Sequence, residues 1–128
     1  MQLLAIIGST TPPGRLSNAV RSAMERASLP GHGASVLDLA TVSLGFADGR
    51  RLDQRGDDSA GIVAQLAQAE AVLFATPVYR ASFTGSLKNL LDLAPVEALR
   101  GKPCGILSMG ATAHHYLGAE SHLRDVLA

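Results

Sequence analysis

The amino-acid sequence predicts an α/β domain, residues 1–128, in which a parallel β-sheet lies between two layers of helices. Short, continuous apolar runs alternate along the chain with segments of helical periodicity. Hydrophobic residues make up 47% of the chain but aromatic residues only 4%, as in buried parallel strands built from Ala, Val, Leu and Ile. A length of 128 residues also suits one domain with one core.

The first strand and the first helix are predicted near the N-terminus. The apolar run Leu3–Ile7 shows no polar alternation, which indicates a strand buried on both faces, and residues 8–14 form a loop containing Gly and Pro. Apolar residues then recur every three or four positions over Leu16–Ala27, and Pro30 ends this helix. A second short strand is expected near Ala34–Leu39.

A polar segment interrupts the pattern after the second strand. Residues 41–58 have no regular apolar spacing. Their charged side chains alternate in sign: Arg50, Arg51, Asp53, Arg55, Asp57 and Asp58. We therefore expect a surface loop here, followed by a helix over Ile62–Ala69.

The rest of the chain repeats the alternation of strand and helix. Ala71–Ala75 is predicted to be the third strand and Phe83–Ala94 the third helix, which Pro95 ends. Gly105–Met109 and residues 116–128 follow as the fourth strand and the fourth helix. Because crossovers between parallel strands are right-handed, the carboxyl ends of these strands meet at one edge of the sheet, where such folds bind ligands.

Charge and cysteine content narrow the classes of partner. The 11 basic and 11 acidic side chains cancel, so the chain lacks the basic surface of a general binder of nucleic acids or membranes. Cys104 is the single cysteine; it cannot form an internal disulfide and is expected in the core. No apolar run approaches the roughly 18 residues of a membrane span, and Met1 is not followed by the basic start of a signal peptide. These features favour a cytoplasmic protein that binds a small molecule.

The loop after the first strand has the composition of a phosphate-binding loop. Its donors are the hydroxyls of Ser9, Thr10, Thr11 and Ser17, the guanidinium of Arg15 and the side-chain amide of Asn18. The start of the next helix adds about half a positive charge, against roughly −1.5 to −2 on a phosphomonoester. No acidic residue precedes Glu25, so no carboxylate in the first helical turns repels a dianion. The alternative is that Ser and Thr only cap the helix.

Two other phosphate-binding patterns are excluded by spacing. The Walker pattern has four residues between its glycines and then Lys, whereas five residues separate Gly8 from Gly14 and Arg15 follows. The dinucleotide pattern needs three glycines, of which only Gly8 is in place. The loop therefore suits a single terminal phosphate.

The loops after the third and fourth strands suit a flat aromatic ring. The candidate contacts are Pro77, Val78, Tyr79 and Arg80 in one loop and Gly110, Ala111 and Thr112 in the other. Pro77 has a fixed backbone angle, and the small residues of the second loop let the backbone approach a ligand. A flavin ring needs such an apolar slot with backbone donors and acceptors at its rim. The alternative is a pair of plain turns, with Tyr79 covering the edge of the core.

The adjacent histidines His114 and His115 do not predict a metal site. Neighbouring residues point to different sides of a helix, and the chain has no matching set of carboxylates or cysteines. We expect no metal.

Taken in order, these motifs resemble those of the NADPH-dependent FMN reductases of the flavodoxin-like fold, especially the branch that serves sulfonate assimilation. The matching segments are Gly8–Ser9 with residues 15–18, residues 75–79, residues 85–92, and residues 110–112 with His115. The resemblance spans essentially the whole chain. It implies a three-layer αβα fold with strand order 2-1-3-4.

The resemblance also implies cofactors and site residues. Ser9, Arg15, Ser17 and Asn18 would hold the phosphate of FMN, Pro77, Val78 and Tyr79 would line the ring, and Gly110 with Thr112 would close the slot. Hydride would pass from NADPH to the flavin with no catalytic acid or base among the side chains. The resemblance does not place the basic pocket for the 2′-phosphate of NADPH; Arg80 and the pair Arg50–Arg51 are the candidates that the sequence offers for it.

The resemblance further implies a homodimer or homotetramer assembled through the helices after the third and fourth strands, with tetramer contacts around residues 120–122. It also implies a flavin-dependent monooxygenase that receives the reduced flavin. The chain departs from the family at residues 10–13, at Ala111, where a second Gly is usual, and in length. Its relatives continue into a fifth strand and a last helix, so we expect another subunit to cover the edge of the fourth strand, or a longer gene product.

Alternative functions are a quinone or azo-dye reductase, an electron-carrier flavodoxin, or a truncated, ligand-free domain.

Overall fold

The sheet of this protein contains four parallel strands in the computed structural model, which describes residues 1–113 and 118–128. The strands are β1 (Gln2–Ile7), β2 (Gly33–Asp38), β3 (Ala71–Pro77) and β4 (Cys104–Met109). Their order is β2-β1-β3-β4, and Ile6 of β1 pairs with Leu37 on one side and Phe74 on the other. The direction of winding reverses between β1 and β3, and α/β sheets bind their ligands at such a point.

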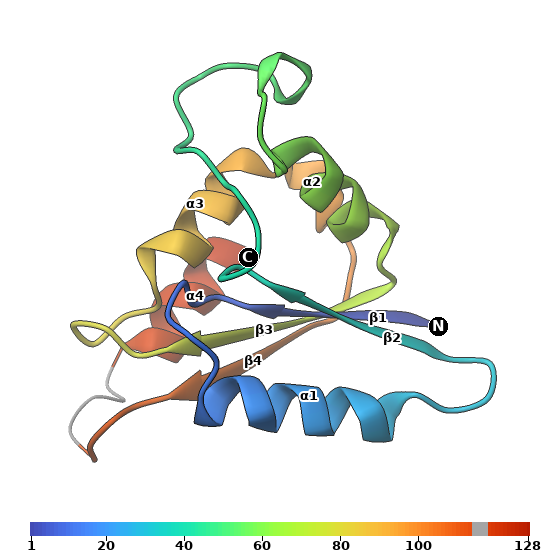
Figure 1. The fold of residues 1–128 in the computed structure, drawn as a ribbon, viewed down its shortest axis with the longest axis vertical. Coiled ribbons are helices and arrows are strands. Elements are labelled where there is room, and N and C mark those ends of the chain that lie inside the picture. Colours follow the sequence, from blue (N-terminus) through green and yellow to red (C-terminus); the bar gives the residue numbers. More distant parts are fainter. Residues whose placement is uncertain (114–117) are drawn as a thin grey trace.

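Helices cover both faces of the sheet (Figure 1). They are α1 (Arg15–Ala27) on one face and α2 (Ser59–Gln68), α3 (Gly85–Leu93) and α4 (Ala119–Leu127) on the other. Short 3₁₀ turns at Leu52–Gln54 and Val96–Ala98 lie in the connections. The predicted three-layer α/β class and the predicted strand order are therefore confirmed.

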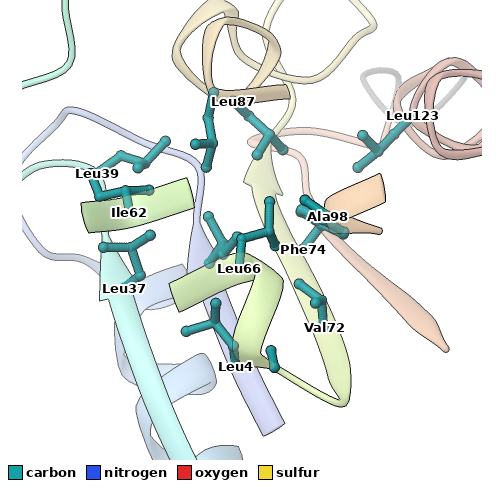
Figure 2. Close-up of a cluster of buried hydrophobic side chains, with 13 residues drawn as sticks. Leu4, Leu37, Leu39, Ile62, Leu66, Val72, Phe74, Leu87, Ala98 and Leu123 are labelled. Carbon is teal, nitrogen blue, oxygen red and sulfur yellow. The ribbon is translucent and has the colours of Figure 1, made fainter. Parts of the chain in front are cut away.

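Each face of the sheet has its own apolar core. Leu4 and Ile6 of β1 belong to the larger core. Figure 2 shows Leu4 in this core with Phe74, Leu66 and Leu87. Their neighbours in the sequence, Ala5 and Ile7, enter the smaller core, where Val20 and Met24 of α1 cover them. Because alternate residues of β1 are buried on opposite faces, this strand appears in the sequence as a continuous apolar run.

The predicted ends of several elements differ from the observed ones. Helix α3 begins at Gly85 rather than at Phe83, because the hydroxyl of Thr84 accepts the N–H of Leu87 at 3.1 Å and caps the helix. The described part of the last helix begins at Ala119, and residues 116 and 117 of its predicted range lie outside the described residues.

The expectation of a buried Cys104 is wrong. Cys104 is exposed at the start of β4. Strand β4 lies at an edge of the sheet, and within residues 1–113 and 118–128 it pairs only with β3. A strand at an edge is covered less than the central strands β1 and β3, which explains the exposure of its residues.

Residues 41–58 form a loop, as predicted, but Arg55 is not a surface residue. Only 1% of its side chain is exposed. Its guanidinium contacts the Asp48 carboxylate at 2.9 Å, the Phe46 carbonyl at 2.9 Å, the Asp57 carboxylate at 3.2 Å and the Ser59 hydroxyl at 3.2 Å. The loop is thus folded around a buried cation that also contacts the start of α2.

Hydrogen bonds keep two carboxyl groups of this loop charged. Donation from the Arg50 side chain and backbone is the main cause that lowers the pKa of Asp48 to about 2. Hydrogen bonds from Ser59 and from the N–H of Gly45 lower the pKa of Asp57 well below its usual range. Both carboxylates therefore favour the folded state when they are ionised.

We expect the protein to lose stability in acid through these two groups. A carboxyl whose pKa is lower in the folded than in the unfolded chain stabilises the fold above the unfolded value, about 3.9, and loses this contribution as the pH falls through the folded value. The free energy of unfolding, measured with urea, should therefore decrease from pH 5 toward about pH 2. The double variant Asp48→Asn/Asp57→Asn should show a shallower decrease, and a slope equal to that of the wild type would contradict the assignment.

Candidate functional site

A cleft of about 220 Å³ lies at the carboxyl ends of the strands, where the strand order reverses. Its lining residues lie at the ends of the strands and in the segments that follow them: Ile7, Ser9 and residues 11–17 from β1 onward, Asp38 at the end of β2, residues 77–79 from the end of β3, and residues 109–111 from the end of β4. All four strands therefore bring residues to one site, at the position where flavodoxin-like sheets bind ligands.

One end of the cleft is rich in hydrogen-bonding groups. Ser9 and Ser17 are both buried, and Arg15 is exposed. The hydroxyl of Ser9 lies 2.7 Å from that of Thr11 and accepts the backbone N–H of Thr11 at 3.2 Å. The loop is thus folded on itself, and its residues Ser9 and Thr11 line the cleft.

The start of α1 contributes to the same end. Gly14 is the N-cap residue, and among the described residues no side chain makes a capping hydrogen bond there. The alternative that the loop's Ser and Thr residues only cap this helix is therefore wrong. The first turn of α1 also contains no acidic residue, so its N–H groups and the positive end of the helix can receive an anion.

Asp38 is a wall residue that the sequence analysis missed. It is 6% exposed, and its Oδ2 accepts a hydrogen bond from Nη2 of Arg21 at 3.0 Å. The Nε of Arg21 in turn donates to the hydroxyl of Ser17 at 3.3 Å. The sequence before Glu25 contains no acid, but the parallel pairing of β2 with β1 places Asp38 beside Ile7, directly before the loop. A carboxylate near the carboxyl end of a predicted strand, Ala34–Leu39, was the available signal.

The other end of the cleft is largely apolar. It is lined by Pro77, Val78 and Tyr79 from the end of β3 onward and by Gly110 and Ala111 after β4. The N–H of Val78 donates to the carbonyl of Met109 at 3.0 Å, which joins the two loops. Tyr79 is 50% exposed and lines the cleft.

A strained turn follows this apolar wall. Arg80 and Ala81 have φ angles of 51° and 60°, which side chains other than Gly rarely adopt. Tyr79 and Ser82 exchange backbone hydrogen bonds of 2.9 and 3.0 Å across the turn. Gly118 packs against it so closely that a Cβ there would lie 2.3 Å from the carbonyl oxygen of Ala81. The turn is therefore held in place from the start of α4.

A buried hydrogen-bond network joins the two ends of the cleft. The hydroxyl of Thr84 donates to the carbonyl of Gly8, and the N–H of Thr84 donates to the hydroxyl of Thr76 at 3.2 Å. Gly8 itself donates to the carbonyl of Ala75 at 2.7 Å and has no room for a side chain, because a Cβ would lie 2.9 Å from that of Leu87. Sequence reasoning missed this role of Thr84.

The structure brings most of the predicted site residues together. Eight of them line the cleft: Ser9, Arg15, Ser17, Pro77, Val78, Tyr79, Gly110 and Ala111. Asn18, Arg80 and Thr112 are exposed and lie outside this lining. Arg50 and Arg51, the other candidate cations, pair with Asp48 and Asp53 in the loop of residues 41–58. The binding roles of all these residues stay predictions.

Two further features concern the described residues only. Residues 1–113 and 118–128 contain no group of three or more His, Cys, Asp and Glu side chains that could hold a metal ion, and His114 and His115 lie outside these ranges. In the same ranges, no helix combines the length and the apolar character needed to cross a membrane.

The fold and the cleft define a class, that of doubly wound α/β domains with a ligand cleft at the reversal of strand order. Residues 1–128 match the family model of the NADPH-dependent FMN reductases, and the chain belongs to this family.

Individual relatives agree with this assignment. The chain is 35% identical over 91 residues to an NAD(P)H-dependent FAD/FMN reductase of Geobacillus thermodenitrificans (strain NG80-2), covering 71% of this chain and 49% of the relative. It is 35% identical over 130 residues to the FMN reductase (NADPH) of Escherichia coli (strain K12), covering 100% of this chain and 66% of the relative. The chain thus spans less than two thirds of the length of either relative.

A solved structure agrees as well. The apo form of an NADH:FMN oxidoreductase superposes with a TM-score of 0.79 at 27% identity, covering 98% of this chain and 67% of that one.

The residues of the cleft fit the FMN that the family name implies. A terminal phosphate matches the end with the hydroxyls, Arg15 and the uncapped start of α1. A planar ring matches the apolar walls formed by residues 77–79 and 110–111. The network of Thr84 holds these two ends in one fixed relation.

Proposed function

We propose that this chain binds FMN in the cleft and, as part of an NAD(P)H-dependent FMN reductase, presents it for hydride transfer from a nicotinamide cofactor. The observation that carries the proposal is the joining of an anion-accepting end to an apolar slot within one cleft. Membership of the FMN reductase family supports it.

The side chains contribute binding and orientation. Arg15 and the hydroxyls of Ser9 and Ser17 would neutralise and hold the phosphate, while Val78 and Tyr79 would lie against the ring. Bound flavin supplies the hydride-accepting atom itself. The residues of this chain therefore need only to place the ring and keep water from one of its faces, so no catalytic acid or base is required.

The proposal is tested by mixing the protein with FMN and NADPH without oxygen. We expect the yellow colour of the flavin to bleach. Charge-assisted hydrogen bonds contribute about 1.5–3 kcal/mol, so at the exposed position of Arg15 the variant Arg15→Ala should raise the Kd of FMN by about tenfold. At FMN concentrations near the wild-type Kd, bleaching should fall accordingly.

The matched control is Arg26→Ala, which removes the same charge from the exposed last turn of α1. It should leave binding and bleaching unchanged. Full FMN affinity in Arg15→Ala would contradict the phosphate role, and an absence of flavin binding by the wild type would contradict the proposed function.

The same proposal extends to partners. Arg80 follows the cleft residue Tyr79 and is exposed, whereas Arg50 and Arg51 are paired with acids elsewhere, so Arg80 is the better candidate for the nicotinamide nucleotide. We further propose that the protein is a homo-oligomer in the cytoplasm and that the cleft releases reduced flavin to a flavin-dependent monooxygenase.

A further inference from the structure

The cleft proposed to bind a phosphate has a buried carboxylate, that of Asp38, in its wall. Asp38 is 6% exposed, lines the cleft, and lies at the end of β2 beside Ile7. Its Oδ1 accepts the N–H of Ala40 at 3.0 Å, so the side chain has a fixed position. A negative charge placed here opposes the binding of phosphate, because two negative charges in a partly desolvated site repel each other.

The carboxylate also engages a cation that the phosphate could otherwise use. Nη2 of Arg21 lies 3.0 Å from Oδ2 of Asp38, and Nε of Arg21 lies 3.3 Å from the hydroxyl of Ser17. The guanidinium of Arg21 therefore bridges the Asp38 carboxylate and the hydroxyl of Ser17, a cleft residue. Arg21 is 47% exposed, so it has room to turn toward the cleft once the carboxylate no longer attracts it.

We propose that Asp38 sets the affinity of the cleft for the flavin phosphate, keeping it low enough for FMN to exchange. The carboxylate offsets the charge of Arg21, so Arg15 and the start of α1 are left to attract the phosphate. This inference rests on the proposed function and deepens it: a chain that hands flavin on must bind it reversibly, and Asp38 provides the opposing charge.

The first test is Asp38→Asn, which removes the charge but keeps an oxygen for the N–H of Ala40. Flavin fluorescence titration should show the Kd of FMN falling by about tenfold, since a nearby charge acts strongly in a partly desolvated cleft. The Kd of riboflavin, which lacks the phosphate, should stay within about twofold, because the charge acts on the phosphate alone. A purely structural role of Asp38 would change both ligands alike.

The matched control is Asp53→Asn. Asp53 is exposed, pairs with Arg51 in the loop of residues 41–58 and lies outside the cleft lining. The same loss of one negative charge at this position should leave the Kd of FMN unchanged, which separates a local effect of Asp38 from an effect of net charge.

A second variant tests the pair from its other side. Arg21→Gln leaves Asp38 without its cation and should raise the Kd of FMN by about tenfold. The double variant Arg21→Gln/Asp38→Asn should return close to the wild-type Kd, because the two opposite charges are removed together.

Weaker FMN binding by Asp38→Asn, or equal changes for FMN and riboflavin, would overturn the inference while leaving the proposed function intact. If the wild type bound neither flavin, the proposed function would fail and this inference with it.

Discussion

Replacing Thr84 with valine is expected to lower the free energy of unfolding by about 2–4 kcal/mol. Valine keeps the shape of the buried side chain but removes its hydroxyl, which caps α3 through Leu87 and donates to the carbonyl of Gly8. Loss of a cap costs about 0.5–2 kcal/mol, and a buried acceptor without its donor about 1–3 kcal/mol. Urea unfolding at neutral pH measures the change.

The control for this prediction is Thr84→Ser, which keeps the hydroxyl and should cost less than valine. The valine variant should also bind FMN more weakly than the serine variant, because Thr84 fixes the loop after β1 to the loop after β3. Equal stability of the two variants would show that the hydroxyl does not contribute as described.

The order of elements was predictable because burial leaves a direct trace in the sequence. Strand β1 is covered on both faces, and the run Leu3–Ile7 is apolar throughout. Ends of elements were less predictable, since they depend on single contacts such as the cap formed by Thr84. The exposure of Cys104 depends on the position of β4 at the edge of the sheet, which the residues around Cys104 do not encode and only the family resemblance implied.

The site was predictable where it consists of loops that follow strands. Ser9 and Tyr79 belong to such loops and Arg15 begins the helix directly after the first of them, and their neighbours in the sequence indicated the chemistry. Asp38 and Thr84 were missed because they reach the site through pairing and packing between segments distant in sequence. Arg55 was missed for the same reason: a charged residue in a polar segment looks exposed until its partners are known.

Replacing Arg55 with methionine is expected to lower the free energy of unfolding by about 3 kcal/mol at neutral pH. Methionine fills much of the buried space but leaves the Asp48 and Asp57 carboxylates without the guanidinium that lies between them. Breaking a buried ion pair from one side costs about 3–5 kcal/mol, and the lower value applies because Asp48 is 42% exposed. Urea unfolding measures this change too.

The control is Arg51→Met, in the same loop. Arg51 is exposed and pairs with the exposed Asp53, so its loss should cost no more than about 1 kcal/mol. The difference in the free energy of unfolding between Arg55→Met and the wild type should also decrease from pH 6 toward pH 2. Without the cation, the pKa of the Asp48 and Asp57 carboxyls is lowered less in the folded protein. The variant therefore loses less stability than the wild type as these carboxyls take up protons. If Arg55→Met were as stable as Arg51→Met at neutral pH, the loop would not depend on its buried cation to fold.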